Sequence, residues 1–295
     1  MKDAYMPKRL GSLPWTDRSG RFSLLKAGVL AGLFGPAIWT FYRLMAGFYM
    51  AEPAKSVNHE LGLWAFRLLL LSLAITPAMQ IFRLPRLIIV RRMVGVAAFA
   101  YAFSHICAYA AMENFHIGKV VSEIFARFYL TIGFSGLLIL ATLSATSVDA
   151  AVRKMGTRAW LRLHRLAYLA AVLALVHYFI QSKLVVTEPT IFAGVFMWLM
   201  GYRIISWMTR PRLASNPVTL FALSFMASVL TMVGEAAGYM LFTPVDGMKV
   251  FDANFTFVAG IRPGWIVLIA GVTVAFLALL RSWKAAAPSR ATAAV

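Results

Sequence analysis

The sequence consists of long apolar stretches separated by short polar connections. The hydrocarbon core of a bilayer is ~30 Å thick, and an α-helix needs about 20 mostly apolar residues to cross it. Eight stretches reach this length, so the pattern predicts an all-α integral membrane protein, a helical bundle of about eight transmembrane helices. The predicted spans cover residues 25–48, 61–82, 93–112, 127–148, 160–181, 190–208, 217–242 and 263–282.

The connections between these spans are too short to hold a folded soluble domain. The longest of them, residues 243–262, has room for a turn or a short surface helix. We therefore expect four parts along the chain. They are a cytoplasmic N-terminal segment (1–24), a six-helix transmembrane core (25–208), a two-helix C-terminal extension (209–284) and a flexible cytoplasmic tail (285–295).

Composition supports the same class of protein. Hydrophobic residues make up 61% of the chain and charged residues only 14%, whereas a soluble domain carries roughly 25% charged residues. The net charge of +18 could indicate a nucleic-acid partner, but the charges lie between apolar stretches and do not form a basic face on a soluble surface. We expect the lipid bilayer as a partner and no nucleic acid.

The distribution of basic residues predicts the orientation. Loops on the cytoplasmic side of a membrane protein carry an excess of lysine and arginine. Of the 29 basic residues, 21 fall on the same side as the N-terminus, together with only 3 of the 11 acidic residues. The chain is therefore expected to cross the membrane several times with both termini in the cytoplasm.

Five histidines provide the candidate chemistry. His59 and His116 lie in predicted outer loops and are interpreted as ordinary surface residues. His105, His164 and His177 lie within predicted spans, where an ionisable group is costly and rare. Each of these three is therefore a candidate functional residue.

Depth in the membrane pairs two of the three. At 1.5 Å per residue, His105 lies ~20 Å above Arg92, and His177 lies ~20 Å above His164. His105 and His177 are thus expected at one level, in the outer half of the membrane, on two different helices. Two facing imidazoles are what a six-coordinate electron-transfer heme requires. A hydrogen-bonded histidine pair and a proton relay remain alternatives.

His164 has no histidine partner at the inner level. Thirteen residues of straight helix do not bring His164 and His177 to one face, so the two share a face only if the fifth span is distorted. His164 is either the ligand of a second, inner heme or an interfacial residue of a basic run, and both interpretations stay open. Candidates for an opposite ligand are Arg91, Arg92, Met79 and Met93.

Arg67 is a further charge inside a predicted span. Its guanidinium group would suit an anionic heme propionate, and snorkelling to the outer interface is an equally good interpretation. The sequence contains no phosphate-binding loop, dinucleotide-binding turn or paired-cysteine metal motif. Electrons are therefore expected to enter from, and leave to, separate molecules.

At these residues the sequence resembles the heme-binding membrane subunits of bacterial methionine sulfoxide reductase systems, within the ferric-reductase-like transmembrane superfamily. The likeness covers roughly residues 12–208. The matching stretches are Gly62–Arg67 running to Thr76-Pro77, Arg91-Arg92 through Gly95 and Tyr101 to His105, Arg127-Phe128-Tyr129, Ala145–Ser147, Trp160–His164, and His177.

The resemblance implies that His105 and His177 ligate a b heme near the outer side and that His164 serves a second, inner redox site. It leaves one or two hemes possible, and FMN has also been assigned as a cofactor in such systems. It further implies a non-catalytic electron-transfer subunit in the bacterial inner membrane. Such a subunit takes electrons from the quinone pool, or from a flavin reductase. It passes them to a periplasmic molybdopterin-containing methionine sulfoxide reductase that repairs oxidised proteins.

Two other functions remain as alternatives. A ferric, metal or oxygen reductase of the same superfamily would have four histidines and a cytoplasmic flavin domain, whereas this chain has three histidines within its spans and no such domain. A transporter could use the histidines as a proton relay, but such proteins often contain internal repeats, and none is found here. The chain departs from the family in its two extra spans within 216–283, whose role the resemblance does not give.

Overall fold

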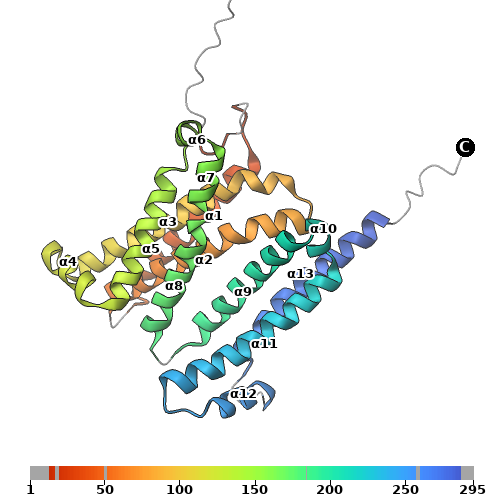
Figure 1. Cartoon of the computed structure of the whole chain (residues 1–295). Helices are drawn as coiled ribbons and strands as arrows, with labels where there is room; N and C mark the ends of the chain where they lie inside the picture. The colour runs from red at the N-terminus through yellow and green to blue at the C-terminus, as the bar shows by residue number, and fades with distance from the viewer. Residues whose placement is uncertain (1–12, 17–19, 50–51, 184, 257–259, 287–295) are drawn as a thin grey trace, which may run out of the picture. The chain divides into compact units, whose positions relative to one another are not determined.

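The computed structural model describes residues 13–16, 20–49, 52–183, 185–256 and 260–286. These residues form a helical fold (Figure 1). Among these described residues, eight helical segments are long and apolar enough to cross a membrane, which confirms the predicted all-α integral membrane class. They are α1 (Leu24–Met45), α2 (Pro53–Ile81), α3 (Ile88–Met112), α5 (Phe128–Ala145), α7 (Thr157–His164) with α8 (Leu166–Ser182), α9 (Thr187–Met208), α11 (Pro217–Phe242) and α13 (Pro263–Ala286).

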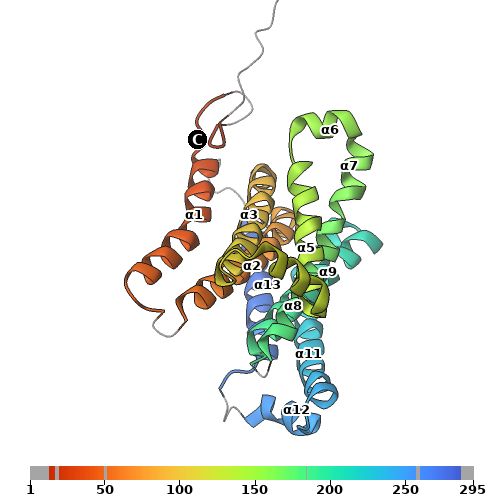
Figure 2. The same ribbon diagram turned by 90° about the vertical axis from the view of Figure 1, so that its left-hand side faces the viewer.

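Short helices occupy several connections. They are the 3-10 turn η1 (Pro85–Leu87), α4 (Ile117–Ala126), α6 (Asp149–Met155), α10 (Pro211–Ala214) and α12 (Gly247–Thr256). The helix α12 lies at the end of α11 in both views (Figure 1, Figure 2) and fulfils the expectation of a short helix within 243–262. Residues 1–12 and 17–19 of the predicted N-terminal segment, and 287–295 of the predicted tail, lie outside the described residues.

The second span begins earlier than the hydropathy pattern predicts. The helix α2 starts at Pro53, a residue well suited to a first helical position because its missing N–H has no partner there in any case. Its first turns contain Asn58, His59 and Glu60, which lower the local hydropathy, and the Glu60 carboxylate pairs with Arg43 at 2.8 Å. The prediction that His59 lies in a loop is therefore wrong, whereas His116 does lie in the connection between α3 and α4.

The fifth span is interrupted between its two histidines. The backbone N–H of Arg165 bonds to the carbonyl of Arg162 at 3.2 Å, a tighter turn than an α-helix makes, and α7 ends there before α8 begins. The fifth span is therefore distorted. As a result, the relative directions of His164 and His177 need not be those of two residues on one straight helix.

The described residues divide into two compact units. Unit 1 comprises those within Met1–Ser72, Leu87–Ala126 and Leu137–Ala167, and unit 2 those within Leu73–Arg86, Arg127–Gly136 and Tyr168–Val295. The helix α9 belongs to the same unit as α11, α12 and α13 and packs against α11 and α13. The boundary at 208 between core and extension stays a prediction.

In unit 1, a tyrosine of α3 completes the backbone of α1 beside a proline. Pro36 lies inside α1, where proline removes a hydrogen bond and crowds the preceding turn. The Tyr101 hydroxyl accepts the N–H of Ala37 at 2.9 Å and donates to the carbonyl of Leu33 at 2.7 Å. It thus bridges two groups that would otherwise bond directly, and joins α3 to α1.

In unit 2, an arginine of α9 plays the corresponding part for α2. Pro77 has no N–H to donate to the carbonyl of Leu73, four residues earlier. The Arg203 guanidinium donates to that carbonyl and also, at 3.1 Å, to the hydroxyl of Tyr168. An intramembrane cation thereby satisfies a backbone acceptor that the proline leaves without its usual donor.

Glycines let α9, α11 and α13 approach closely. A Cβ placed on Gly271 of α13 would lie 2.7 Å from Cβ of Ser224 and 3.0 Å from Nε1 of Trp198. The indole N–H of Trp198 donates to the Ser224 hydroxyl at 3.0 Å, so neither neighbour is loose. Close packing of small residues is how helices associate in membranes, where no hydrophobic effect drives them together.

We expect Gly271→Ala to destabilise the protein by about 1–3 kcal/mol, the usual cost of overpacking a well-filled core. Helix propensity acts in the opposite direction by at most ~1 kcal/mol. Gly238→Ala in α11 is the matched control, because a Cβ there meets nothing within 4 Å. Thermal unfolding in detergent measures both, and equal midpoints for the two variants would contradict the packing argument.

A buried ion pair joins α11 to the start of α13. Arg262 donates to a carboxylate oxygen of Glu235 at 2.9 Å, with the two side chains 18% and 1% exposed. Next to it, the indole N–H of Trp265 donates to the backbone carbonyl of the fully buried Asn254 at 2.7 Å, which fastens α12 to α13. The part of unit 2 that contains α12 and the start of α13 is thus held by polar contacts as well as by close packing.

Candidate functional site

His105 is held against α2 by two features of that helix. Its Nδ1 lies 2.8 Å from the backbone carbonyl oxygen of Asn58. One helical turn later comes Gly62, where a Cβ would lie 2.9 Å from Nδ1 and 3.0 Å from Cε1 of the same imidazole. Since a carbonyl only accepts, Nδ1 carries the proton, and the lone pair that can bind a metal belongs to Nε2.

His177 is held in the same way in unit 2. Its Nδ1 lies 2.8 Å from the carbonyl oxygen of Tyr129 in α5. Gly133 follows one turn later, and a Cβ there would lie 2.9 Å from both Nδ1 and Cε1 of the ring. The tautomer is therefore the same as that of His105, with the lone pair on Nε2.

His164 has a different setting. Its Nε2 lies 3.2 Å from the hydroxyl of Thr146, and its ring stacks on Trp160 with centroids 3.9 Å apart. The indole N–H of Trp160 in turn donates to the carbonyl of Thr146 at 2.9 Å. Thr146, Trp160 and His164 thus form one cluster near the ends of α5 and α7, and here the hydrogen bond engages Nε2, whereas in His105 and His177 it engages Nδ1.

The predicted arginines lie in unit 1. Arg91 and Arg92 of α3 are electrostatic neighbours of His164, and Arg92 also pairs with Asp149 at 2.6 Å. Arg67 lies with its guanidinium carbon 4.9 Å from the ring centroid of Trp64. Arg91 and Arg92 thus lie close enough to His164 to act on its charge, and Arg67 lies on α2 beside an aromatic ring.

The donor set suits a metal that brings most of its own ligands. Among the described residues, no group of three or more His, Cys, Asp or Glu side chains could hold a bare metal ion. A porphyrin supplies four nitrogens and needs only single imidazoles above and below the iron. Half-buried histidines with an Nδ1–H bonded to a backbone carbonyl have the outer-shell partner that metal-binding histidines almost always have.

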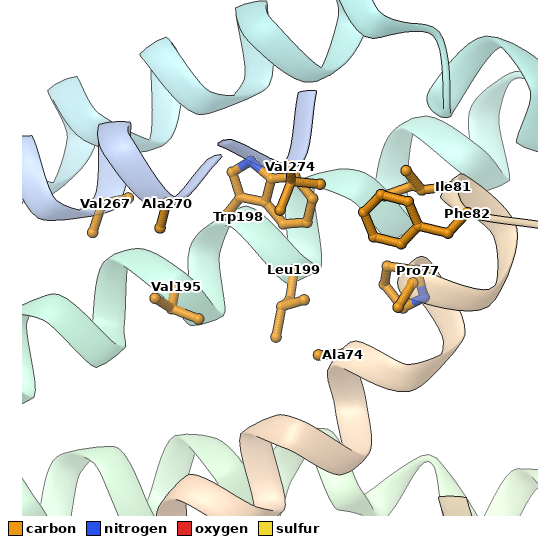
Figure 3. Close-up of a pocket in the computed structure, with 11 residues that line it drawn as sticks. Ala74, Pro77, Ile81, Phe82, Val195, Trp198, Leu199, Val267, Ala270 and Val274 are labelled. Carbon is orange, nitrogen blue, oxygen red and sulfur yellow. The ribbon is translucent and has the colours of Figure 1, made fainter. Parts of the chain in front are cut away.

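A separate cavity in unit 2 offers no such donors. It has a volume of about 200 Å³ and is bounded by the end of α2, by α9 and by α13 (Figure 3). All eleven lining residues are hydrophobic, with Trp198, Leu199 and Phe82 among the largest. This lining contains no side chain that ligates iron.

Sequence reasoning missed the residues that surround the histidines. Gly62 appeared only as part of a matching stretch, and the roles of Gly133, Thr146 and Trp160 were not predicted. A glycine inside an apolar span is a weak signal of close approach. The identity of the approaching group depends on the tertiary fold, so the sequence alone could not supply it.

Fold and site together define a multi-pass, ferric-reductase-like transmembrane protein. The family described as "Ferric reductase like transmembrane component" matches residues 61–175, which include His105 and His164 but not His177. More specifically, the chain belongs to the family of protein-methionine-sulfoxide reductase heme-binding subunits.

Three relatives illustrate this membership, all described as protein-methionine-sulfoxide reductase heme-binding subunit MsrQ. The protein of Caulobacter vibrioides is 39% identical over 193 residues, 63% of this chain and 92% of the relative. That of Rhodospirillum rubrum is 36% identical over 202 residues, 68% and 95% of the two chains. That of Cronobacter sakazakii is 37% identical over 181 residues, 61% and 90%. No solved structure matches the chain significantly.

Proposed function

We propose that the chain is the membrane electron-transfer subunit of a methionine sulfoxide reductase system and binds heme b with His105 and His177 as axial ligands. The observation that carries the proposal is the setting of these two imidazoles. Each bonds through Nδ1 to a backbone carbonyl at 2.8 Å, which makes Nε2 the ligand atom. The relatives from Caulobacter vibrioides and Rhodospirillum rubrum are described as heme-binding subunits, which supports the choice of cofactor.

The protein's contribution would be to hold the heme, to orient it and to shield it from water. When bound, heme supplies a one-electron redox centre whose potential depends on its ligands, their hydrogen bonds and the burial of the site. His105 and His177 would hold the iron through Nε2. Arg67 is assigned to a heme propionate, where a guanidinium group would neutralise and hydrogen-bond the carboxylate.

A second redox site is assigned to the inner side. His164 would be its central residue, with Arg91 and Arg92 as neighbouring cations and Trp160 as a stacking platform. This combination of an aromatic surface and positive charge suits a planar anionic cofactor, either a second heme or FMN. Titration of heme and of flavin per chain distinguishes these cases.

The partners follow from the same assignment. We propose that electrons enter from the quinone pool or from reduced flavin supplied by a flavin reductase. They leave to a periplasmic molybdopterin-containing reductase that repairs oxidised methionines. The protein would lie in the bacterial inner membrane with both termini in the cytoplasm, as the distribution of basic residues predicts, and would itself catalyse no methionine chemistry.

Absorption spectroscopy of the purified protein tests this function. Protein expressed with ample heme and purified in detergent should show a b-type spectrum after reduction by dithionite, with at least one heme per chain. A quinol analogue should reduce the same heme if the quinone pool is the donor. A protein that folds normally and contains no heme would overturn the proposal.

A further inference from the structure

One arrangement of three groups occurs twice among the residues that the structure describes. A backbone carbonyl, a glycine one helical turn later and an imidazole from another helix come together around His105 and again around His177. In both places the Nδ1–oxygen distance is 2.8 Å, and a Cβ on the glycine would lie 2.9 Å from Nδ1. The glycines are Gly62 in α2 and Gly133 in α5.

The repeated spacing has a geometric cause. In an α-helix the carbonyl of residue i also accepts the N–H of residue i+4, so the carbonyls of Asn58 and Tyr129 each face the glycine one turn later. An imidazole that reaches the second lone pair of such a carbonyl must lie against residue i+4. Any side chain there would occupy the position of the ring.

Other glycines show that this contact is not general. A Cβ on Gly95 in α3 would meet nothing within 4 Å, and one on Gly136, a turn after Gly133, would meet Cβ of Leu173 only at 3.7 Å, an ordinary contact. His164, in contrast, is held by the hydroxyl of Thr146 and the ring of Trp160. The glycine and carbonyl arrangement thus distinguishes the two proposed axial histidines from the third.

We propose that Gly62 and Gly133 are positioning residues for the axial histidines, and that they set the imidazole plane, the Nδ1–H bond to the carbonyl and thereby the reduction potential of the heme. The proposal rests on heme ligation by His105 and His177 as proposed above. An Nδ1–H that donates to a carbonyl increases the basicity of Nε2. A more basic ligand stabilises ferric over ferrous iron, so loss of the bond should raise the potential.

The test compares Gly62→Ala and Gly133→Ala with the control variants Gly95→Ala and Gly136→Ala. Heme per chain, the electron paramagnetic resonance spectrum of the ferric protein and the midpoint potential are measured for all four and for the unaltered protein. The controls should match the unaltered protein. The first two variants should show shifted resonance values, and the ratio of reduced to oxidised heme at a fixed applied potential should rise about tenfold, equivalent to about 59 mV for one electron.

A second measurement separates positioning from a general packing defect. The stability lost by Gly62→Ala should disappear in a His105→Ala background, because the new methyl group then meets no ring. Gly133→Ala should likewise cost nothing in a His177→Ala background. Thermal unfolding of the heme-free proteins in detergent provides this comparison even where a glycine variant no longer binds heme.

The outcomes separate the two proposals. If the unaltered protein lacks heme, the proposed function fails. If it binds heme and the alanine variants at Gly62 and Gly133 keep the same resonance spectrum and potential, the positioning role is wrong while the function stands. A stability penalty that persists after removal of the histidine would also overturn the positioning role.

Discussion

Replacing His105 or His177 with alanine is expected to abolish the b-type heme spectrum of the purified protein. Under the proposed assignment, each substitution removes one of the two imidazoles that would hold the iron, each of which is bonded to a backbone carbonyl at 2.8 Å. Loss of an outer-shell partner alone costs roughly 10–100-fold in metal affinity. Loss of the ligand itself should cost at least as much. Heme per chain, measured after purification, reports the effect.

Two surface histidines provide the controls for this result. His59 lies near the start of α2 and His116 between α3 and α4, and alanine at either position should leave the spectrum unchanged. Retention of a normal spectrum by His105→Ala or His177→Ala would contradict the ligand assignment. The His164→Ala variant then gives the stoichiometry, since it should halve the heme content only if a second heme is present.

The second large effect concerns stability. We expect Arg262→Ala to destabilise the protein by about 3–5 kcal/mol, the cost of leaving a buried charge without its partner. The Glu235 carboxylate is 1% exposed and bonds to Arg262 at 2.9 Å, so water cannot replace the lost guanidinium. Thermal or denaturant unfolding in detergent measures the change. The double variant Glu235→Met with Arg262→Met should recover most of it, because two apolar side chains leave no buried charge.

An exposed ion pair in the same chain is the matched control. Lys55 and Glu52 lie 2.6 Å apart with side chains 63% and 62% exposed, and such pairs contribute about 0–1 kcal/mol. Lys55→Ala should therefore change the unfolding midpoint little. If Arg262→Ala proved no more destabilising than Lys55→Ala, the pair between α11 and α13 would have no part in stability.

The sequence predicted the number of spans because membrane thickness fixes the length of an apolar helix. It misplaced the start of α2 because Asn58, His59 and Glu60 are polar, whereas the structure keeps them helical and pairs Glu60 with Arg43. The sequence indicated only that the fifth span must be distorted if His164 and His177 are to share a face. It did not locate the break at Arg165, because no proline or glycine marks it.

The surroundings of the histidines were harder to predict than their positions. Depth along a helix follows from residue number, so His105 and His177 could be selected from the sequence. Their backbone partners lie 47 and 48 residues away along the chain, and such contacts depend on which helices become neighbours. Hydropathy carries no information about that choice, and the glycines Gly62 and Gly133 could be interpreted only once the fold was known.

The contact between Arg203 and Leu73 bears on the order in which the protein is made. The chain is synthesised from its N-terminus, so α2 enters the membrane before α9 exists. Pro77 has no N–H to donate to the carbonyl of Leu73, and the Arg203 guanidinium donates to this carbonyl instead. Before Arg203 is synthesised, the carbonyl therefore has neither of these donors. An unsatisfied backbone group in lipid costs several kcal/mol. The second helix is therefore complete only when the sixth span has been inserted, and a nascent chain that ends before α9 carries an unfinished segment in the bilayer.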